Sequence, residues 1–259
     1  MDKLEKALQK AREQRAHATG KPQGQNQTTT QRASYVKTNQ SNLVSISDIQ
    51  MDRARIVAHK TQSKEADTFR ILRTQVLQIM NNDGLRSLAI TSPRYSDGKT
   101  TIALNLAISI ALDLKQTVLL VDLDFRKPNL HEFLGYEPSA GLTDYLFRNT
   151  PIPDCMIRLS FERMTVLPAG SPVDQSSEAI GLPKMAALAR ELKTRYPDRF
   201  IIYDMPPVLE QDDPLAFMPN VDSVLLVARE GKTKPSEIAH TVELLSSARI
   251  IGTVLNEKL

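Results

Sequence analysis

Cysteine and tryptophan are almost missing from this sequence. Its 259 residues include one cysteine, Cys155, and no tryptophan. A single cysteine excludes a disulfide framework and a cysteine metal site within one chain, which agrees with a reducing cytoplasm. The four histidines, at positions 17, 59, 131 and 240, are too dispersed in the sequence to suggest a metal site.

Long hydrophobic runs are also missing. The most apolar stretch, residues 102–114, is shorter than the ~18 to 20 residues that span a bilayer, and it contains Asn105 and Asp113. The first residues, MDKLEKALQKAREQ, alternate charges and are not typical of a signal peptide. We therefore expect a cytoplasmic protein, which another molecule would have to hold if it works at a membrane.

The net charge is small and unevenly distributed. The formal net charge is +3, from 33 Lys/Arg and 30 Asp/Glu, and residues 1–40 hold eight of the basic and three of the acidic residues. The rest of the chain therefore has 25 basic and 27 acidic residues, a net charge of −2. Such a near-neutral body argues against nucleic acid as a partner. The basic N-terminal segment suits a solvated arm better than a contact with anionic lipid or an acidic protein.

The chain has two regions of different composition, with the boundary between residues 43 and 44. In residues 1–43, Leu4, Ala7, Leu8 and Ala11 have helical spacing, and residues 18–40 are polar and rich in Gln and Thr. A segment of this composition cannot bury enough apolar surface to offset its chain entropy. We predict a short helix and a flexible linker over residues 1–43, and a single globular domain over residues 44–259.

The globular part has the pattern of an α/β protein. Short, continuously apolar runs predict strands at 87–92, 117–122, 164–168, 200–204, 223–228 and 250–256. Segments with helical periodicity predict helices at 66–80, 182–196 and 235–248. Continuous apolar strands separated by helices indicate a doubly wound, mostly parallel sheet with helices on both faces.

A phosphate-binding loop is indicated by SPRYSDGKTT at residues 92–101. Strand, tight turn and helix N-terminus together bind phosphates through backbone N–H groups, and the pattern G-x-x-x-x-G-K-[ST] identifies such loops. Pro93 replaces the first glycine, and Ser96 brings a side chain to a position where the backbone should approach the ligand. The expected nucleotide-binding residues of this segment are Ser96, Asp97, Gly98, Lys99, Thr100 and Thr101, with Lys99 on the phosphates and the Thr100 hydroxyl on Mg²⁺.

Three aspartates follow buried strands of the predicted sheet. Asp122 and Asp124 end the strand at 117–122, and Asp204 ends the strand at 200–204. Ligands of α/β sheets bind at the carboxyl ends of the strands. Together with the GKT sequence, these acids indicate the metal and base constellation of a nucleotide hydrolase or phosphotransferase. For Asp124, an ion pair with Arg126 is the alternative role.

The sequence VLLVDLDFRKP, residues 118–128, resembles the second aspartate motif of the bacterial tyrosine kinases of capsule and exopolysaccharide biosynthesis. The similarity extends from Val44 to Asn256, and includes GLTDYL at 141–146, IIYDMPPVLEQDD at 201–213 and GTVLN at 252–256. It implies the P-loop fold of the deviant-Walker superfamily, to which the partition and septum-site (MinD/ParA-like) ATPases belong.

The resemblance implies roles for individual residues. ATP and Mg²⁺ are the implied ligands, with Lys99, Asp122 and Asp124 as the catalytic residues. Thr100, Asp122 and Asp204 would organise the metal. Asn256 would contact adenine, and Arg94 stands where the superfamily often has a second lysine, which reaches a phosphate within one subunit or across a boundary.

The resemblance also implies partners. The family makes a ring interface through an E-x-x-R-x-x-R helix, which here reads Asp67, Arg70 and Arg73. A solvated helix face is the alternative for these arginines. The family acts with a membrane-bound polysaccharide co-polymerase, or chain-length determinant, so the resemblance implies a cytoplasmic protein that is peripheral to the inner membrane through that partner.

One feature of the family is not found in this sequence. Members that phosphorylate themselves usually end in a tyrosine-rich tail, whereas this sequence ends in LNEKL and its six tyrosines are scattered. Tyr35 is the one in a segment predicted to be mobile, and Tyr95 lies in the phosphate loop. Nucleotide binding is therefore better supported than kinase activity.

Three functions are compatible with these residues. The leading hypothesis is an ATP- and Mg²⁺-dependent, tyrosine kinase-like regulator of exopolysaccharide or capsule polymerisation and export. The alternative is a non-catalytic, nucleotide-gated scaffold, favoured by the altered loop and the tyrosine distribution. A partition-type positioning ATPase is disfavoured by DFRKP and by the near-neutral domain, because nonspecific DNA binding needs a basic surface.

Overall fold

The structure is a computed structural model that describes residues 43–113, 116–196 and 198–257. The predicted N-terminal helix and linker lie outside these residues, so the division at residue 43 stays a prediction. No helix in the described part of the chain is both long enough and apolar enough to cross a membrane.

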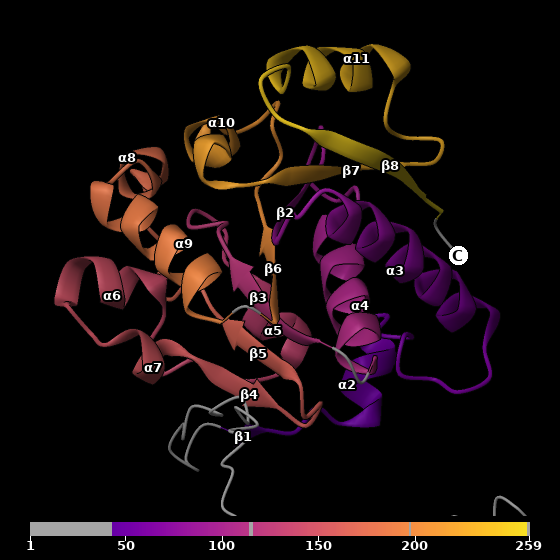
Figure 1. The fold of residues 1–259 in the computed structure, drawn as a ribbon, viewed down its shortest axis with the longest axis horizontal. Coiled ribbons are helices and arrows are strands. Elements are labelled where there is room, and N and C mark those ends of the chain that lie inside the picture. Colours follow the sequence, from indigo (N-terminus) through magenta and orange to yellow (C-terminus); the bar gives the residue numbers. More distant parts are fainter. Residues whose placement is uncertain (1–42, 114–115, 197, 258–259) are drawn as a thin grey trace, which may run out of the picture. The chain divides into compact units, whose positions relative to one another are not determined.

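One eight-stranded sheet forms the centre of the fold, in the order β1-β4-β5-β3-β6-β2-β7-β8 (Figure 1). Every neighbouring pair is parallel except β4 and β5, which are antiparallel. The strands are β1 Leu43–Val44, β2 Ser87–Thr91, β3 Thr117–Asp122, β4 Ile157–Leu159, β5 Met164–Leu167, β6 Arg199–Asp204, β7 Ser223–Arg229 and β8 Ile250–Asn256. The predicted mostly parallel α/β sheet is confirmed.

Helices cover both faces of this sheet. Figure 1 shows α3 and α4 on one side of the strands and α6 and α9 on the other. The helices are α2 Asp48–Arg53, α3 Lys64–Asn82, α4 Lys99–Ala111, α5 Leu130–Leu134, α6 Leu142–Arg148, α7 Ile152–Cys155, α8 Ser176–Ile180, α9 Pro183–Arg195, α10 Asp213–Phe217 and α11 Pro235–Leu244, with a 3₁₀ turn at Met218–Asn220.

Two hydrophobic clusters result from the alternation of side chains along the strands. Leu88 and Ile90 of β2 face the cluster beneath α3 and α4, whereas Ala89 faces the cluster beneath α6 and α9. Successive side chains of a strand point to opposite faces, and the strands β2, β3, β5, β6, β7 and β8 contribute to both clusters because both of their faces are covered. This burial explains why the strands are continuously apolar.

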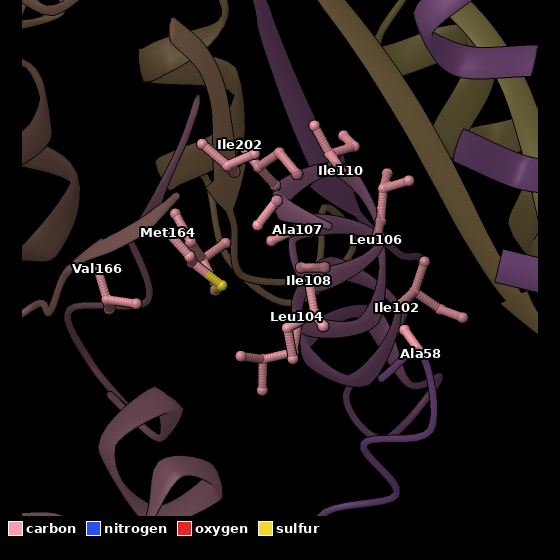
Figure 2. Close-up of a cluster of buried hydrophobic side chains, with 14 of the residues drawn as sticks. Ala58, Ile102, Leu104, Leu106, Ala107, Ile108, Ile110, Met164, Val166 and Ile202 are labelled. Carbon is pink, nitrogen blue, oxygen red and sulfur yellow. The ribbon is translucent and has the colours of Figure 1, made fainter. Parts of the chain in front are cut away.

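The helix after the phosphate loop, α4, is the most deeply buried helix, with every residue except Thr101 buried. Figure 2 shows its side chains packed with those of Ala58, Met164, Val166 and Ile202. Asn105 interrupts the apolar sequence. Its Oδ1 accepts hydrogen bonds from the Val57 and Ala58 N–H groups at 2.7 and 3.0 Å, and its Nδ2 donates to the carbonyls of Arg55 and Thr101, each at 2.9 Å. The amide thus satisfies backbone groups of the segment that precedes α3.

Candidate functional site

The phosphate loop joins β2 to α4 at the carboxyl edge of the sheet. Gly98, the residue before α4, has φ 97°, and a Cβ there would overlap the Asn256 side-chain amide. Ser96 also has a positive φ, 67°. Pro93 uses its carbonyl, which accepts a hydrogen bond from the Leu209 N–H at 3.2 Å, so the N–H that proline lacks is not needed to join this loop to the segment after β6.

The carboxylate of Asp97 holds the loop in shape. Its Oδ2 accepts a hydrogen bond from the Arg94 N–H at 3.0 Å, and its Oδ1 accepts one from the Thr233 hydroxyl at 3.0 Å. Burial raises the pKa of this carboxyl. The Asp97 backbone carbonyl accepts a hydrogen bond from Asn256 Nδ2 at 2.9 Å. The Ser96 carbonyl accepts one from Arg229 Nη1 at 3.1 Å. Nucleotide binding by Asp97 and Ser96 stays a prediction. Their backbone N–H groups would have to make the contact.

The structure brings the predicted lysine and carboxylates together. Lys99 is 5% exposed, and its Nζ lies 3.5 Å from Asp124 Oδ2. Asp122 and Asp204 are opposite each other in the parallel pairing of β3 and β6. Asp124 does not pair with Arg126, whose Nε donates instead to the Ser176 hydroxyl at 2.8 Å. The alternative role considered for Asp124 is therefore not what the structure shows.

The three carboxylates differ in how their oxygens are satisfied. Asp122 Oδ1 accepts a hydrogen bond from the Asp124 N–H at 3.0 Å, and its Oδ2 accepts one from the Leu130 N–H at 3.4 Å. Neither oxygen of Asp204 has a hydrogen-bond partner of ordinary geometry within the described residues, although the Thr100 hydroxyl is nearby. Burial raises the pKa of Asp122, and the neighbouring Asp204 raises it further. Burial also raises the pKa of Asp204, against the opposing charge of Lys99.

This donor set fits a magnesium ion whose remaining ligands come from a nucleotide. Buried carboxylates without partners need a cation, because leaving such groups unsatisfied is costly. The described residues contain no group of three or more His, Cys, Asp or Glu that could hold a metal by itself. Mg²⁺ is usually held by one or two carboxylates together with phosphate oxygens and water. Thr100, Asp122 and Asp204 could supply the protein's share.

Two residues with roles implied by the resemblance lie beside the loop. Asn256 ends β8, and its amide bonds the loop backbone as described above. The exposed Arg94 side chain reaches α11, where its Nε donates to Glu237 Oε1 at 2.6 Å, and its Nη1 lies 3.8 Å from Glu210 Oε1. Its guanidinium is therefore engaged by carboxylates of its own chain. The adenine contact and the phosphate contact stay predictions.

The ring of Tyr95 contacts two lysines at the site. The centroid of its ring is 5.5 Å from Lys99 Nζ and 4.4 Å from Lys127 Nζ. Its hydroxyl accepts a hydrogen bond from Gln211 Nε2, and its N–H donates to Glu210 Oε1 at 3.3 Å. Burial, and then the charge of Asp124, raise the pKa of the Tyr95 hydroxyl to about 12.

Several of these residues were missed by the sequence analysis, namely Lys127, Gln211, Arg229, Thr233 and Glu237. A signal for two of them existed, since Lys127 belongs to the DFRKP sequence and Gln211 follows the strand that ends in Asp204. The others bond the loop from more than 100 residues away in the sequence.

The predicted interface residues lie on α3, away from the phosphate loop. Arg70 pairs with Asp67, and its Nη2 donates to the Lys60 carbonyl at 2.8 Å and the Thr61 carbonyl at 3.2 Å. Arg73 Nη1 donates to the Ser109 carbonyl, near the end of α4, at 3.0 Å. Both arginines are half-buried and bond backbone groups of their own chain, so they are not a freely solvated face. Their interface role stays a prediction.

The fold and site together define a class of protein. A phosphate loop with a buried lysine, next to aspartates at the carboxyl ends of adjacent parallel strands, is the arrangement of P-loop nucleotide-binding proteins. Residues 88–257 match the family described as the CobQ/CobB/MinD/ParA nucleotide binding domain.

Relatives of known name match most of the chain. CapB of Staphylococcus aureus is 30% identical over 203 residues, which are 78% of this chain and 88% of CapB. Tyrosine-protein kinase YwqD of Bacillus subtilis (strain 168) is 29% identical over 210 residues, 80% of this chain and 87% of YwqD. The succinoglycan biosynthesis transport protein ExoP of Rhizobium meliloti (strain 1021) is 30% identical over 210 residues, 79% of this chain and 26% of ExoP.

Solved structures agree with these relatives. The chimerical protein CapA2B2 superposes with a TM-score of 0.73 at 27% identity, over 84% of this chain and 93% of that one. The septum site-determining protein MinD of Pyrococcus horikoshii OT3, complexed with Mg-ADP, superposes with a TM-score of 0.55 at 26% identity. The match covers 66% of this chain and 70% of that one. The chain therefore belongs to the CobQ/CobB/MinD/ParA nucleotide-binding family, within the group of the bacterial tyrosine kinases of capsule and exopolysaccharide biosynthesis.

Proposed function

We propose that this protein binds ATP with Mg²⁺ and transfers the γ-phosphoryl group to a tyrosine hydroxyl, in the regulation of exopolysaccharide or capsule assembly. The observation that carries the proposal is the convergence of Lys99 with the buried carboxylates of Asp122, Asp124 and Asp204. The names of YwqD and ExoP support the acceptor and the process.

The lysine, the threonine and the three aspartates each have a task in this reaction. Lys99 and the loop N–H groups stabilise the charge of the transferred phosphoryl group. Thr100, Asp122 and Asp204 hold Mg²⁺ and its water molecules. When Lys99 turns to the phosphates, it leaves Asp124, whose carboxylate can then take the proton of the acceptor hydroxyl. The oxygen–phosphorus bond forms as the bond to the leaving diphosphate oxygen breaks, and that electron pair stays on ADP.

The test compares the wild type with Lys99→Met and Asp122→Asn. We expect both variants to lose MgATP turnover and phosphotyrosine, because removing such charge-stabilising groups costs about 10²-fold or more. Lys60→Met is the matched control, since the Lys60 side chain is 42% exposed and its Nζ pairs with Asp52, away from Lys99. Intact mass after incubation with MgATP, followed by a peptide map, identifies any phosphorylated tyrosine. Equal turnover in all four proteins would contradict the enzymatic proposal.

A nucleotide-gated scaffold without transfer is the second candidate. The position of the Tyr95 ring over Lys99 favours it, because an aromatic side chain in the cradle opposes the approach of a triphosphate. Nucleotide-dependent oligomers that form without phosphotyrosine would support the scaffold. A monomer that ignores MgATP would exclude it.

The partner in either case is a separate membrane-bound chain-length protein, which would hold this chain at the cytoplasmic side of the inner membrane. A ring formed through Asp67, Arg70 and Arg73 is the proposed assembly. Co-purification with the membrane fraction only when the partner is co-expressed would support this placement. Recovery in the membrane fraction without it would contradict it.

A further inference from the structure

Gln211 is a buried amide that the proposed reaction has not yet used. It lies between β6 and α10 and is 7% exposed. Its Nε2 donates a hydrogen bond to the Tyr95 hydroxyl and lies 3.4 Å from Asp124 Oδ1. Its Oε1 is buried and has no hydrogen-bond partner within the described residues. The amide therefore holds a phenolic hydroxyl beside the carboxylate and retains one free acceptor atom.

The group that Gln211 holds is a tyrosine hydroxyl, the same chemical group as the proposed acceptor. Tyr95 brings this hydroxyl from the phosphate loop, and the Nζ atoms of Lys99 and Lys127 both lie near its ring. The position combines two cations beside the ring, a carboxylate, and an amide that can both donate and accept. This combination would recognise a tyrosine side chain as a whole.

We propose that Gln211 and Asp124 form the subsite that receives the acceptor tyrosine, and that Tyr95 occupies this subsite until an acceptor displaces it. This inference rests on the proposed function and deepens it. Gln211 is a catalytic residue in this scheme, because its amide contacts the reacting hydroxyl. Glutamine side chains orient the attacking oxygen in other phosphoryl-transfer enzymes, so the role suits the group.

The packing of the loop supports an occupant that can leave. Tyr95 is half-buried, and its loop carries exposed residues on both sides, Arg94 and Ser96. Gln211, by contrast, is fixed in a buried segment whose neighbours Val208 and Leu209 donate hydrogen bonds to the Ser92 and Pro93 carbonyls at 2.9 and 3.2 Å. The receiving group is thus held more firmly than its occupant.

The first test measures phosphorylation of a Glu/Tyr copolymer at varied copolymer and ATP concentrations. Tyr95→Phe removes the competing hydroxyl, and we expect the KM for the copolymer to fall roughly three- to tenfold, the range of one hydrogen bond, with the KM for ATP nearly unchanged. Gln211→Ala should raise the KM for the copolymer, or lower kcat, by a similar factor. Tyr145→Phe is the matched control, because Tyr145 also lies 4.4 Å from a lysine Nζ, that of Lys184.

The second test does not depend on turnover. Protein labelled with 3-fluorotyrosine gives a fluorine NMR resonance for Tyr95, assigned by its loss in Tyr95→Phe. With MgADP present, N-acetyltyrosinamide should shift this resonance toward its position in unfolded protein while leaving that of Tyr145 in place. In Gln211→Ala the Tyr95 resonance should already be shifted before N-acetyltyrosinamide is added.

The two proposals fail in different ways. If the wild type transfers no phosphate, the proposed function is wrong, and the NMR titration still decides whether the subsite exists. If transfer occurs but Tyr95→Phe and Gln211→Ala behave like Tyr145→Phe in both measurements, the subsite is wrong and the proposed function stands.

Discussion

Asp122 and Asp204 are direct partners on neighbouring parallel strands, and both side chains are buried. Burial raises the pKa of each, and the charge of Asp204 raises that of Asp122 further. Lys99 offsets this only in part, so without a metal ion the site lowers the stability of the folded protein. Function and stability oppose each other at this edge of the sheet, as is common at active sites.

Replacing Asp204 by Asn should stabilise the protein when Mg²⁺ and nucleotide are absent. The neutral amide removes a buried charge, and we expect a gain of about 1–3 kcal/mol in the free energy of unfolding near pH 8. A raised pKa means that the folded state holds the proton more tightly than the unfolded state. For Asp122 the pKa rises from the ordinary 3.8 to about 8, so the wild type loses stability as the pH rises through this range. The gain should therefore be smaller near pH 5.

Urea unfolding in EDTA at both pH values measures this effect, with Asp198→Asn as the control at an exposed carboxylate. A wild type that is more stable than Asp204→Asn at the higher pH would contradict the electrostatic interpretation.

Gly98→Ala should abolish nucleotide binding. It should also lower the stability of the protein by more than the unfavourable backbone conformation alone would. The residue has φ 97°, and the new Cβ would overlap the Asn256 amide. Gly84→Ala is the matched control, since Gly84 has φ 66° but no atom within 4 Å of the added Cβ. We expect the control to lose about 1–2 kcal/mol of stability and to bind nucleotide normally. Binding of a fluorescent ATP analogue distinguishes the two, and equal binding by both variants would contradict the proposed cradle.

Asn105→Leu should destabilise the fold by about 2–4 kcal/mol, because it leaves the buried Ala58 N–H and the part-buried Val57 N–H and Arg55 carbonyl without this partner. The shape of leucine is close to that of asparagine, so the loss reports hydrogen bonding rather than a cavity. Urea unfolding measures it, with the exposed Asn81→Leu as control. A change below about 0.5 kcal/mol would contradict the anchoring role.

Arg73→Ala should have two separable effects. The loss of its hydrogen bond to the Ser109 carbonyl should lower the stability of the monomer by about 1 kcal/mol. If α3 also forms the ring interface, the variant should in addition lose MgATP-dependent oligomers in sedimentation velocity. Arg190→Ala, on the exposed face of α9, is the control. Oligomers of unchanged size in Arg73→Ala would contradict the interface but not the hydrogen bond.

Much of the fold could be predicted because its main signals are local. All six predicted strands are found within one residue at each end, since a strand buried on both faces is a continuous apolar run. The two strands that were missed, β1 and β4, have two and three residues. So short a run has no periodicity, and its pairing depends on the neighbouring strand. The helices at 130–134 and 152–155 are similarly short and depend on tertiary contacts.

The site residues also differ in whether a local signal in the sequence marks them. Lys99, Asp122 and Asp204 could be predicted because a motif or a strand end marks each of them. The contacts of Tyr95 with Gln211 and of Asp97 with Thr233 join residues 116 and 136 positions apart. Nothing in a single sequence pairs such residues, so the altered positions of the loop could be seen as departures but not explained. The structure explains Pro93 by a carbonyl that bonds the segment after β6.

The most direct measurement of the central claim is a calorimetric titration of the protein with ADP, in Mg²⁺ and in EDTA. If Lys99 and the buried carboxylates form a magnesium–nucleotide site, the wild type binds ADP more tightly with Mg²⁺, and both Lys99→Met and Asp122→Asn lose that advantage. Binding of equal strength with and without Mg²⁺, unchanged in the two variants, would contradict the account.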